Sequence, residues 1–325
     1  MNTTAQGRDL GIEAVRVTEA TALAVSGFCG RGDERAADEA AVAAMHDALR
    51  SLSVDGTIRI GEGAENEVPK LYVGEKVGIG GGAKMDVAVV PLEGGNAVAR
   101  GDPNALCVFA MTEGGGFLNA PDIYMDKLAV GSGLPDDLVD LDEEPGRNLG
   151  ELAKAKGVDV RELLVCVLDR PRHAELIAKI RQVGARIMLI AGGDISGVIA
   201  TNWPRRGVDI YMGVGGAPHG VLAAAALVCV GGQMQGRLVF PGDRGKEMMA
   251  RYGIEQPDRK YSAADMASGD ITFSATGITT GPILHGIRHH FDKPVTHSLA
   301  LRSSTQEVRY IETHHGFSRR PGPKS

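Results

Sequence analysis

The sequence is poor in the features that mark several classes of protein. Only 4% of its 325 residues are aromatic, and it lacks a basic stripe with interleaved aromatic residues, which argues against nucleic acid as a partner. The longest apolar run, Val221 to Val230, is shorter than the roughly 20 residues that span a bilayer. The first residues contain no apolar signal core. We therefore expect a cytoplasmic protein with no nucleic-acid partner and no membrane partner.

Cysteine is also scarce, and the cysteines do not have the spacing of a metal site. Three of the four lie in apolar runs, which is typical of reduced residues in a hydrophobic core. The four positions are Cys29, Cys107, Cys166 and Cys229.

What is present is an ordinary globular composition. The chain is 43% hydrophobic and 23% charged, with a net charge of -6, and it is long enough for a sizeable core and two domains. Glycine is abundant, at 45 residues, and it concentrates between strand-like runs. This pattern indicates tight turns between strands and helices, and places where the backbone approaches a small ligand.

The first half of the chain favours two helices followed by short strands. Apolar residues recur at helical spacing over residues 9–29 and 34–53. Asp33 closes the loop between these helices, where an N-cap residue is expected. Short apolar runs ending in glycine, proline or polar residues predict strands at 57–60, 87–90 and 107–111.

An acidic, loop-like stretch from about residue 138 predicts a boundary near 140–160, so we expect one unit over residues 1–150 and another over 151–325. The second half alternates between strand and helix patterns, which predicts a mostly parallel sheet covered on both faces. Closing antiparallel strands are expected at 296–314. The alternating elements are strands at 163–168, 186–190, 208–212 and 271–275, and helices at 174–183, 195–200 and 220–230.

Three carboxylates of the first half lie beside glycine or proline at the ends of expected elements. They are Asp33, Glu62 and Glu93. Oxygen ligands in loops that can curl around an ion suit Mg²⁺ or Mn²⁺. Two such ions about 3.5–4 Å apart would clamp the attacking and leaving oxygens of a phosphate ester. Each acid taken singly also fits a helix cap or a solvated loop residue.

Several sequence blocks occur together in the order typical of one family. The chain resembles the class II fructose-1,6-bisphosphatases of bacteria, within the lithium-sensitive phosphatase superfamily, over about residues 9–315. The blocks are Arg16–Glu19, Gly30–Asp33, Asp55–Ile58, Ile60–Gly63, Leu71–Gly78, Asn119–Met125, Arg170–His173, Gly215–Pro218 and Ser274–Thr279.

The resemblance implies a fold and an activity. The fold is a two-domain layered α/β sugar-phosphatase fold, an αβαβα sandwich with an α+β metal-binding half and an α/β sugar-phosphate-binding half. The activity is hydrolysis of the 1-phosphate of fructose 1,6-bisphosphate in gluconeogenesis, with Mn²⁺ or Mg²⁺ as cofactor. The implied partners are a sugar bisphosphate and further copies of the chain, as a homodimer or homotetramer.

The resemblance also assigns roles to residues. It implies metal ligands at Asp33, Glu62, Glu93 and His219, with Glu93 also catalytic. Substrate contacts fall on Gly94, Tyr124, Arg170, Arg172, Asp194 and Gly216.

The chain departs from the family pattern where metal and water are expected to bind. Val90 and Gly95 stand where the family has a ligand Asp and a catalytic Thr, and His219 stands in place of a Glu. Valine offers no lone pair, and Asp86 lies about 13 Å further back along the same strand, too far to replace it. Metal affinity should therefore fall. Other departures are Arg170 in place of a Lys, and Gly192 in place of an acid.

Several positions keep two interpretations. His219 is a neutral imidazole ligand for Mn²⁺ or Zn²⁺, or a loop histidine bonded to the backbone. Tyr124 contacts the sugar phosphate, or it is a half-buried core residue. Arg170 and Arg172 hold phosphate oxygens, or they lie on a solvated loop.

The function likewise has more than one reading. The first is a working sugar bisphosphatase with an altered metal site. The second is a weak or silent paralogue that binds sugar phosphates as a sensor or as a partner subunit. The third is a related phosphatase with another substrate, such as sedoheptulose 1,7-bisphosphate, because pocket shape sets that choice.

Overall fold

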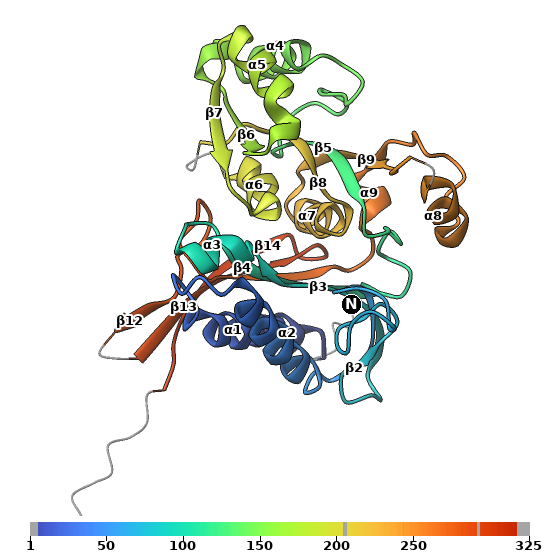
Figure 1. Cartoon of the computed structure of the whole chain (residues 1–325), viewed down its shortest axis with the longest axis vertical. Helices are drawn as coiled ribbons and strands as arrows, with labels where there is room; N and C mark the ends of the chain where they lie inside the picture. The colour runs from blue at the N-terminus through green and yellow to red at the C-terminus, as the bar shows by residue number, and fades with distance from the viewer. Residues whose placement is uncertain (1–5, 204–206, 243, 291–292, 317–325) are drawn as a thin grey trace, which may run out of the picture.

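The computed structural model describes residues 6–203, 207–242, 244–290 and 293–316. Figure 1 shows the chain as stacked layers, with a pair of helices below one sheet, a layer of helices above it, a second sheet, and further helices on the outside. This is the αβαβα arrangement that the sequence analysis expects.

The outer layer beside the first sheet consists of α1 (Gln6–Ser26) and α2 (Glu34–Leu49). Both expected helices are confirmed, although α2 ends four residues earlier than predicted. Asp33 is the N-cap of α2, and its carboxylate accepts a hydrogen bond from the Ala36 N–H at 2.9 Å. This bond satisfies a backbone donor that the first helical turn would otherwise leave unpaired.

The first sheet has eight strands among the described residues, and it combines the start and the end of the chain. Its order is β12-β13-β11-β4-β3-β1-β2, with β14 on the free side of β13. Only β1 and β3 run parallel. The strands are β1 (Val54–Ile60), β2 (Lys76–Val77), β3 (Ala83–Glu93), β4 (Leu106–Glu113), β11 (Thr272–Gly277), β12 (Arg288–His290), β13 (Lys293–Arg302) and β14 (Glu307–His314).

The second sheet has the order β10-β9-β5-β8-β6-β7. The expected mostly parallel sheet is wrong, since only the β6–β7 and β6–β8 pairs are parallel and β5, β9 and β10 add antiparallel pairs. The parallel part is the stretch with clear strand–helix alternation. The strands are β5 (Tyr124–Val130), β6 (Leu164–Leu168), β7 (Arg186–Ile190), β8 (Ile210–Gly216), β9 (Gln233–Val239) and β10 (Tyr261–Ser262).

Two expectations on strands need correction. The sequence analysis predicts no strand at β5, because Asp126 and Lys127 interrupt its apolar pattern. The strand expected at 271–275 forms as β11, but it pairs with β4 and β13 of the first sheet instead of extending the alternating sheet of the second half.

Most of the other helices lie between the two sheets or above the second one, while α8 lies to the side beyond β9, as Figure 1 shows. Between the sheets are α6 and α7, with α9 packed against α7. On the outer face of the second sheet are α4 and α5. Short 3₁₀ turns occupy 160–162, 171–173 and 200–202. The bounds are α3 (Gly95–Arg100), α4 (Pro145–Lys156), α5 (Ala174–Val183), α6 (Asp194–Ile199), α7 (Ala217–Val230), α8 (Arg244–Tyr252) and α9 (Ala263–Met266).

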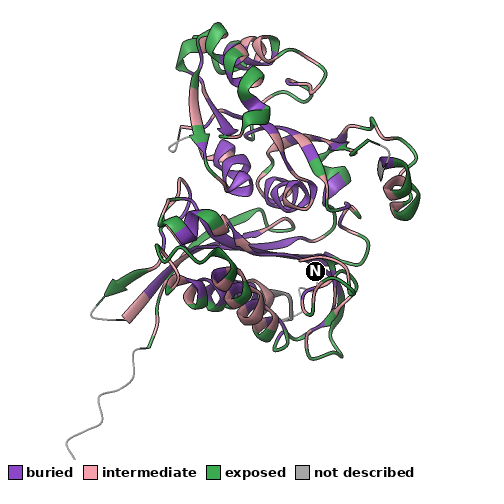
Figure 2. Cartoon of the chain, viewed as in Figure 1, coloured by how far each residue is buried: buried purple, intermediate pink, exposed green. Residues whose placement is uncertain are grey.

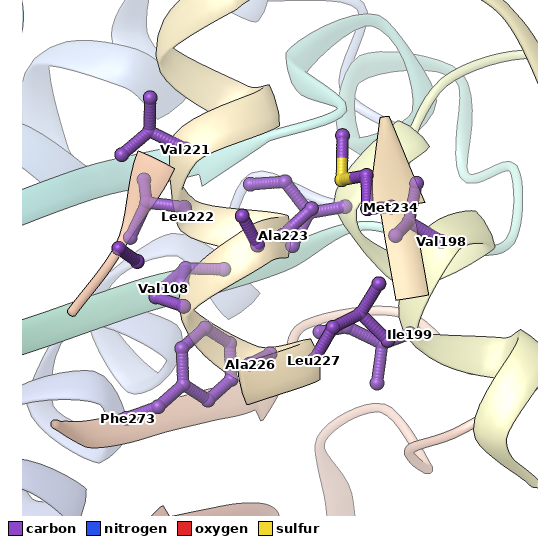
Figure 3. Packing of buried hydrophobic residues seen from close by; sticks show 14 of the residues in the cluster. Val108, Val198, Ile199, Val221, Leu222, Ala223, Ala226, Leu227, Met234 and Phe273 are labelled. Atoms are coloured by element: carbon purple, nitrogen blue, oxygen red, sulfur yellow. The ribbon is translucent and has the colours of Figure 1, made fainter. Parts of the chain in front are cut away.

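Helix α7 is the centre of the molecule. Its alanine-rich sequence is apolar on all sides, which is the pattern of a helix surrounded by protein. Ten of its fourteen residues are buried, and Figure 2 shows it almost wholly in the colour of buried residues. Figure 3 shows Leu222 and Ala226 of α7 among Val108 and Phe273 of the first sheet and Met234 of the second.

The layering follows from the alternation of side chains along each strand. In β4, Val108 belongs to the core between the sheets, whereas Cys107 and Phe109 belong to the core under α1 and α2. In β6, Cys166 faces the middle layer and Val165 faces α4 and α5. Because both faces of each sheet are covered, these strands are apolar throughout.

The division into residues 1–150 and 151–325 stays a prediction. The two sheets cross that boundary, because β5 precedes it and lies in the second sheet, while β11 to β14 follow it and lie in the first. Within the described residues, no helix is both long enough and apolar enough to cross a membrane. All four cysteines are free thiols, and Cys107, Cys166 and Cys229 are buried as expected.

The packing of α7 predicts a stability effect. Leu222 is fully buried, so Leu222→Ala should lower the free energy of unfolding by about 2–5 kcal/mol. Leu189 on β7 is 40% exposed, and Leu189→Ala should cost less than about 1 kcal/mol. Urea denaturation measures both values. Equal losses at the two positions would contradict a packed middle layer around α7.

Candidate functional site

A cavity of about 310 Å³ lies between the two sheets, at the end of β3. Its walls come from the start of α2, the β3–α3 junction, the first residue of β5, the loops after β6 and β7, and the β8–α7 junction. Every site residue predicted from the sequence lines this cavity except Asp33 and Glu62.

Three side chains in the cavity form a cluster with metal-ligating atoms. Glu93 ends β3, Asp194 begins α6, and His219 lies in the first turn of α7. Their ligand atoms all lie within 4.8 Å of one another, and no other such group occurs in the described part of the chain. The structure thus brings together two predicted ligands with Asp194, which was expected to contact substrate.

His219 contacts both carboxylates. Its Nδ1 is 3.0 Å from Asp194 Oδ1 and 3.7 Å from Glu93 Oε1. The side chain is 34% exposed, so one part faces the cavity while Nδ1 faces the acids. The interpretation of His219 as a loop histidine bonded to backbone is wrong, because its partner is the Asp194 carboxylate and it belongs to a helix.

Asp194 is held by a buried lysine that the sequence analysis does not identify. Lys127 on β5 donates to Asp194 Oδ2, and both side chains are almost completely buried. The pair lies directly on the backbone of β8, where a Cβ atom at Gly215 would come within 2.1 Å of Asp194 Oδ2. Glycine is therefore required at position 215. A lysine on the core-facing side of a strand was the available signal for this pair.

Glu93 offers a free ligand atom. Its Oε1 accepts the Ile195 N–H at 2.8 Å, while its buried Oε2 has no hydrogen-bond partner. A buried acceptor without a partner is costly, and a bound cation would satisfy it. Two carboxylates and one imidazole form a donor set that fits a divalent ion such as Mn²⁺.

Burial and neighbouring charge shift the pKa values of this cluster. Burial and the nearby Asp194 charge raise the pKa of Glu93 to about 8. Burial alone would raise the pKa of Asp194, but Lys127 and His219 hold it well below its ordinary value. Burial opposes the charged form of His219, yet Asp194 and Glu93 raise its pKa overall. Without a cation, Glu93 is thus the carboxyl group of the cluster that carries a proton at neutral pH, whereas Asp194 stays ionised.

Asp33 and Glu62 do not join the cluster. The Asp33 carboxylate caps α2 and is exposed, as its alternative interpretation expects. Glu62 lies near enough to His219 for a positive charge on His219 to lower the pKa of Glu62. Burial, followed by the charge of Asp38, raises the pKa of Glu62 to about 7.

The position expected to hold a further ligand is apolar. Val90 is buried in the core between the sheets. Asp86, on the same face of β3, accepts from Arg59 Nε at 2.8 Å and from the Gly115 N–H. Asp86 is therefore engaged elsewhere, in agreement with the expectation that it cannot replace a ligand at position 90.

The opposite wall of the cavity is positively charged. Arg170 donates to the carbonyls of Asp169 and Ala191, and Arg172 donates twice to the carbonyl of Val214. Neither guanidinium is paired with an acid within the ranges that the structure describes. Backbone carbonyls thus fix the orientation of both groups and leave their charge available to an anion.

Tyr124 belongs to this wall. It is 51% exposed, so it is half-buried as one interpretation expects, but it lines the cavity and does not lie in the core. The guanidinium carbon of Arg172 lies 4.7 Å from the centre of its ring, a cation–π contact that holds both side chains at the rim.

Glycines and one asparagine shape the floor. Gly94 has φ of 91°, a conformation that favours glycine, and is the N-cap of α3. Gly216 caps α7 beside His219. Asn104, which the sequence analysis does not identify, donates to the Gly192 carbonyl and accepts from Ser196. It thereby ties the loop after β7 to the start of α6.

Comparisons of the sequence with known proteins point to one family. Residues 8–315 match the family described as bacterial fructose-1,6-bisphosphatase, glpX-encoded. The chain is 43% identical to fructose-1,6-bisphosphatase 1 class 2 of Escherichia coli strain K12, over 96% of this chain and 97% of that protein. It is 39% identical to a D-fructose 1,6-bisphosphatase class 2/sedoheptulose 1,7-bisphosphatase of Synechococcus sp. strain JA-3-3Ab, over 94% and 95%.

The Lys127–Asp194 pair predicts strong coupling. Lys127→Met should lower the free energy of unfolding by about 3–5 kcal/mol, because it removes the cation that neutralises the buried Asp194 carboxylate. Combining it with Asp194→Asn should cost clearly less than the sum of the two single changes. Denaturant unfolding of the four proteins measures the coupling. Additive losses would show that the pair does not act as a unit.

The pKa of Glu93 predicts how stability depends on pH. Between the ordinary value of 4.5 and about 8, the folded chain binds more protons than the unfolded chain, so stability falls as pH rises. Metal-free protein should therefore unfold more easily at a pH of about 8 than at about 5. Glu93→Gln, which cannot ionise, should weaken this dependence. Denaturation in a chelating buffer measures it, and an unchanged slope in the variant would exclude Glu93 as the cause.

Proposed function

The chain belongs to the bacterial, glpX-encoded fructose-1,6-bisphosphatase family, and from this premise we propose that it hydrolyses the 1-phosphate of fructose 1,6-bisphosphate. The observation that carries the proposal is the polarity of the cavity. One wall presents two arginines that donate to backbone carbonyls, and the other presents two carboxylates and an imidazole within ligand distance of one another.

In this proposal the arginine wall binds the phosphate. Arg170 and Arg172 donate hydrogen bonds to phosphate oxygens, and their orientation is already fixed by carbonyls. The start of α7 lies at the same cavity, and the positive end of a helix favours an anion. Tyr124 at the rim donates its hydroxyl to the sugar phosphate.

The acidic wall would hold a divalent cation. Glu93, Asp194 and His219 are the proposed ligands of this wall, and Mn²⁺ suits the imidazole better than Mg²⁺ does. Such an ion polarises the phosphoryl group and makes bound water acidic. The roles of Asp33 and Glu62 as further ligands, of Gly94 and Gly216 as substrate contacts, and of Glu93 as a catalytic residue are part of the same proposal.

Within the chain, Lys127 serves as a positioning residue. It neutralises Asp194 and fixes the carboxylate against β8, so that Asp194 presents Oδ1 to His219. Asn104 donates a hydrogen bond to the Gly192 carbonyl and so holds the loop after β7 in place. The charged groups are thus held in place before a ligand binds. Such preorganisation stabilises the charge that develops in a transition state without further reorganisation.

A specific observation favours a second candidate function. Val90 is packed in the core, and Gly95 presents no side chain to the cavity, so the metal and water side is depleted while the arginine wall is intact. The second candidate is a chain that binds sugar phosphates without appreciable turnover, as a sensor or partner subunit. Action on sedoheptulose 1,7-bisphosphate, assembly as a homodimer or homotetramer, and a cytoplasmic location are also proposed.

Phosphate release tests the proposal. Purified protein with fructose 1,6-bisphosphate should release inorganic phosphate only when Mn²⁺ or Mg²⁺ is present, and chelation should abolish release. Glu93→Gln should lower kcat by at least about 10²-fold. Arg172→Ala should mainly weaken substrate binding by removing a charged phosphate contact.

The controls separate the two candidates. Arg186→Ala, on β7 outside the cavity, should leave turnover unchanged. Sedoheptulose 1,7-bisphosphate in place of the fructose ester tests the substrate range. No release from either ester at saturating Mn²⁺, combined with sugar-phosphate binding in calorimetry, would reject hydrolysis and support the binding protein.

A further inference from the structure

Glu34 occupies the place that a side chain at position 95 would take. Glu34 lies in the first turn of α2, and Gly95 begins α3. A Cβ atom built on Gly95 would lie 3.0 Å from Glu34 Oε1 and 3.1 Å from its Cγ. Gly95 does not have a positive φ, so the backbone does not demand glycine here. The space beside it is simply filled by a carboxylate from another helix.

The Glu34 side chain belongs to the cavity of the candidate site. It lines the same 310 Å³ space as Glu93, His219 and the two arginines. In the described residues its carboxylate makes no hydrogen bond and no ion pair, and the arginines across the cavity bond to carbonyls instead. A carboxylate that faces a phosphate-binding space would repel the phosphate, unless it accepts a hydrogen bond from a donor or binds a cation.

A cation is the less suitable partner. The Glu34 oxygens are not part of the group whose ligand atoms lie within 4.8 Å of one another. Glu34 therefore does not complete the cluster of Glu93, Asp194 and His219 in this arrangement. Water fits better, because a carboxylate accepts hydrogen bonds at several lone-pair sites. It can therefore orient a water molecule and accept a proton from it.

We propose that Glu34 orients the attacking water for phosphate ester hydrolysis; this inference rests on the proposed function. The carboxylate accepts a hydrogen bond from the water. As the water oxygen bonds to phosphorus, one water proton passes to Glu34. The bond between phosphorus and the sugar oxygen breaks, its electron pair stays on that oxygen, and the oxygen takes a proton from solvent. Glu34 returns its proton to solvent, so the chain is regenerated.

Glu34 also has a purely structural role that the test must separate. An acid in the first turn of a helix is stabilised by the helix dipole. Glu34→Gln removes the charge and keeps the shape, whereas Glu34→Ala also vacates the space beside Gly95. The matched control is Glu39→Gln, one turn further along α2, where Glu39 pairs with Arg35 and is exposed to solvent.

The primary test compares turnover with binding. Glu34→Gln should lower kcat by about 10²–10⁴-fold, the range for a group that handles the water proton. Its KM should stay within about twofold of the value for the unmodified chain. Its affinities for fructose 1,6-bisphosphate and for Mn²⁺, measured by calorimetry, should also stay within about twofold. Glu39→Gln should keep the kcat of the unmodified chain. Equal kcat in Glu34→Gln and the unmodified chain would overturn the proposal, and so would a large loss of Mn²⁺ affinity.

A second test uses the shared space at position 95. Gly95→Thr in the unmodified chain should lower kcat, because the new side chain displaces the Glu34 carboxylate. In the Glu34→Ala background, Gly95→Thr should raise kcat by about tenfold or more, because its hydroxyl occupies the vacated space and can hold the water. The sign of the Gly95→Thr effect should therefore reverse between the two backgrounds. The same sign in both would contradict the proposed exchange of roles.

The outcomes distinguish this inference from the function on which it rests. An unmodified chain that releases no phosphate with any divalent metal would reject both. An active chain whose Glu34→Gln variant is equally active would reject only the role of Glu34. Thermal unfolding of each variant shows whether a loss of kcat comes from a loss of folded protein.

Discussion

The candidate site depends on one buried ion pair. Lys127 and Asp194 join the second sheet to the start of α6 in the middle layer, and Asp194 in turn fixes His219 at the start of α7. An isolated charge in this position would be strongly unfavourable, whereas the pair with its further hydrogen bond is tolerated. Because Gly215 leaves no room for movement, the geometry of the acidic wall is set by backbone and charge together. The cavity therefore has a defined shape before any ligand binds.

Much of the fold could be predicted from the sequence. Helical spacing identified α1, α2 and α5, and short apolar runs identified β4, β6 and β7 with small errors at their ends. The layered sandwich followed from resemblance and is present. Strand pairing was harder. Apolar periodicity reports burial and says nothing of which strand lies alongside, so β11 was assigned to the wrong sheet and the antiparallel part of the second sheet was missed.

The candidate site was predictable where its residues lie in recognisable motifs. Glu93, Asp194 and His219 were named in advance and converge, although their grouping differs from the expected ligand set. Lys127 and Glu34 were not identified, for different reasons. Lys127 acts through a contact 67 residues away. Glu34 matters because it fills the space beside Gly95. The sequence does not show which residue fills that space, because the answer depends on how α2 and α3 pack.

The return of the chain to its first sheet has a consequence for biosynthesis. Strand β4 pairs with β11, and α1 packs on β11 and β13. While the polypeptide is being made, β1, β3 and β4 can pair with one another, but the contacts of α1 and β4 with β11 cannot form until β11 has left the ribosome. Contacts between residues so far apart in the sequence slow folding, because the entropy cost of closing the long loop comes before the contacts can stabilise the fold. Until β11 emerges, the faces of α1 and β4 that pack against it lack that partner in a nascent chain.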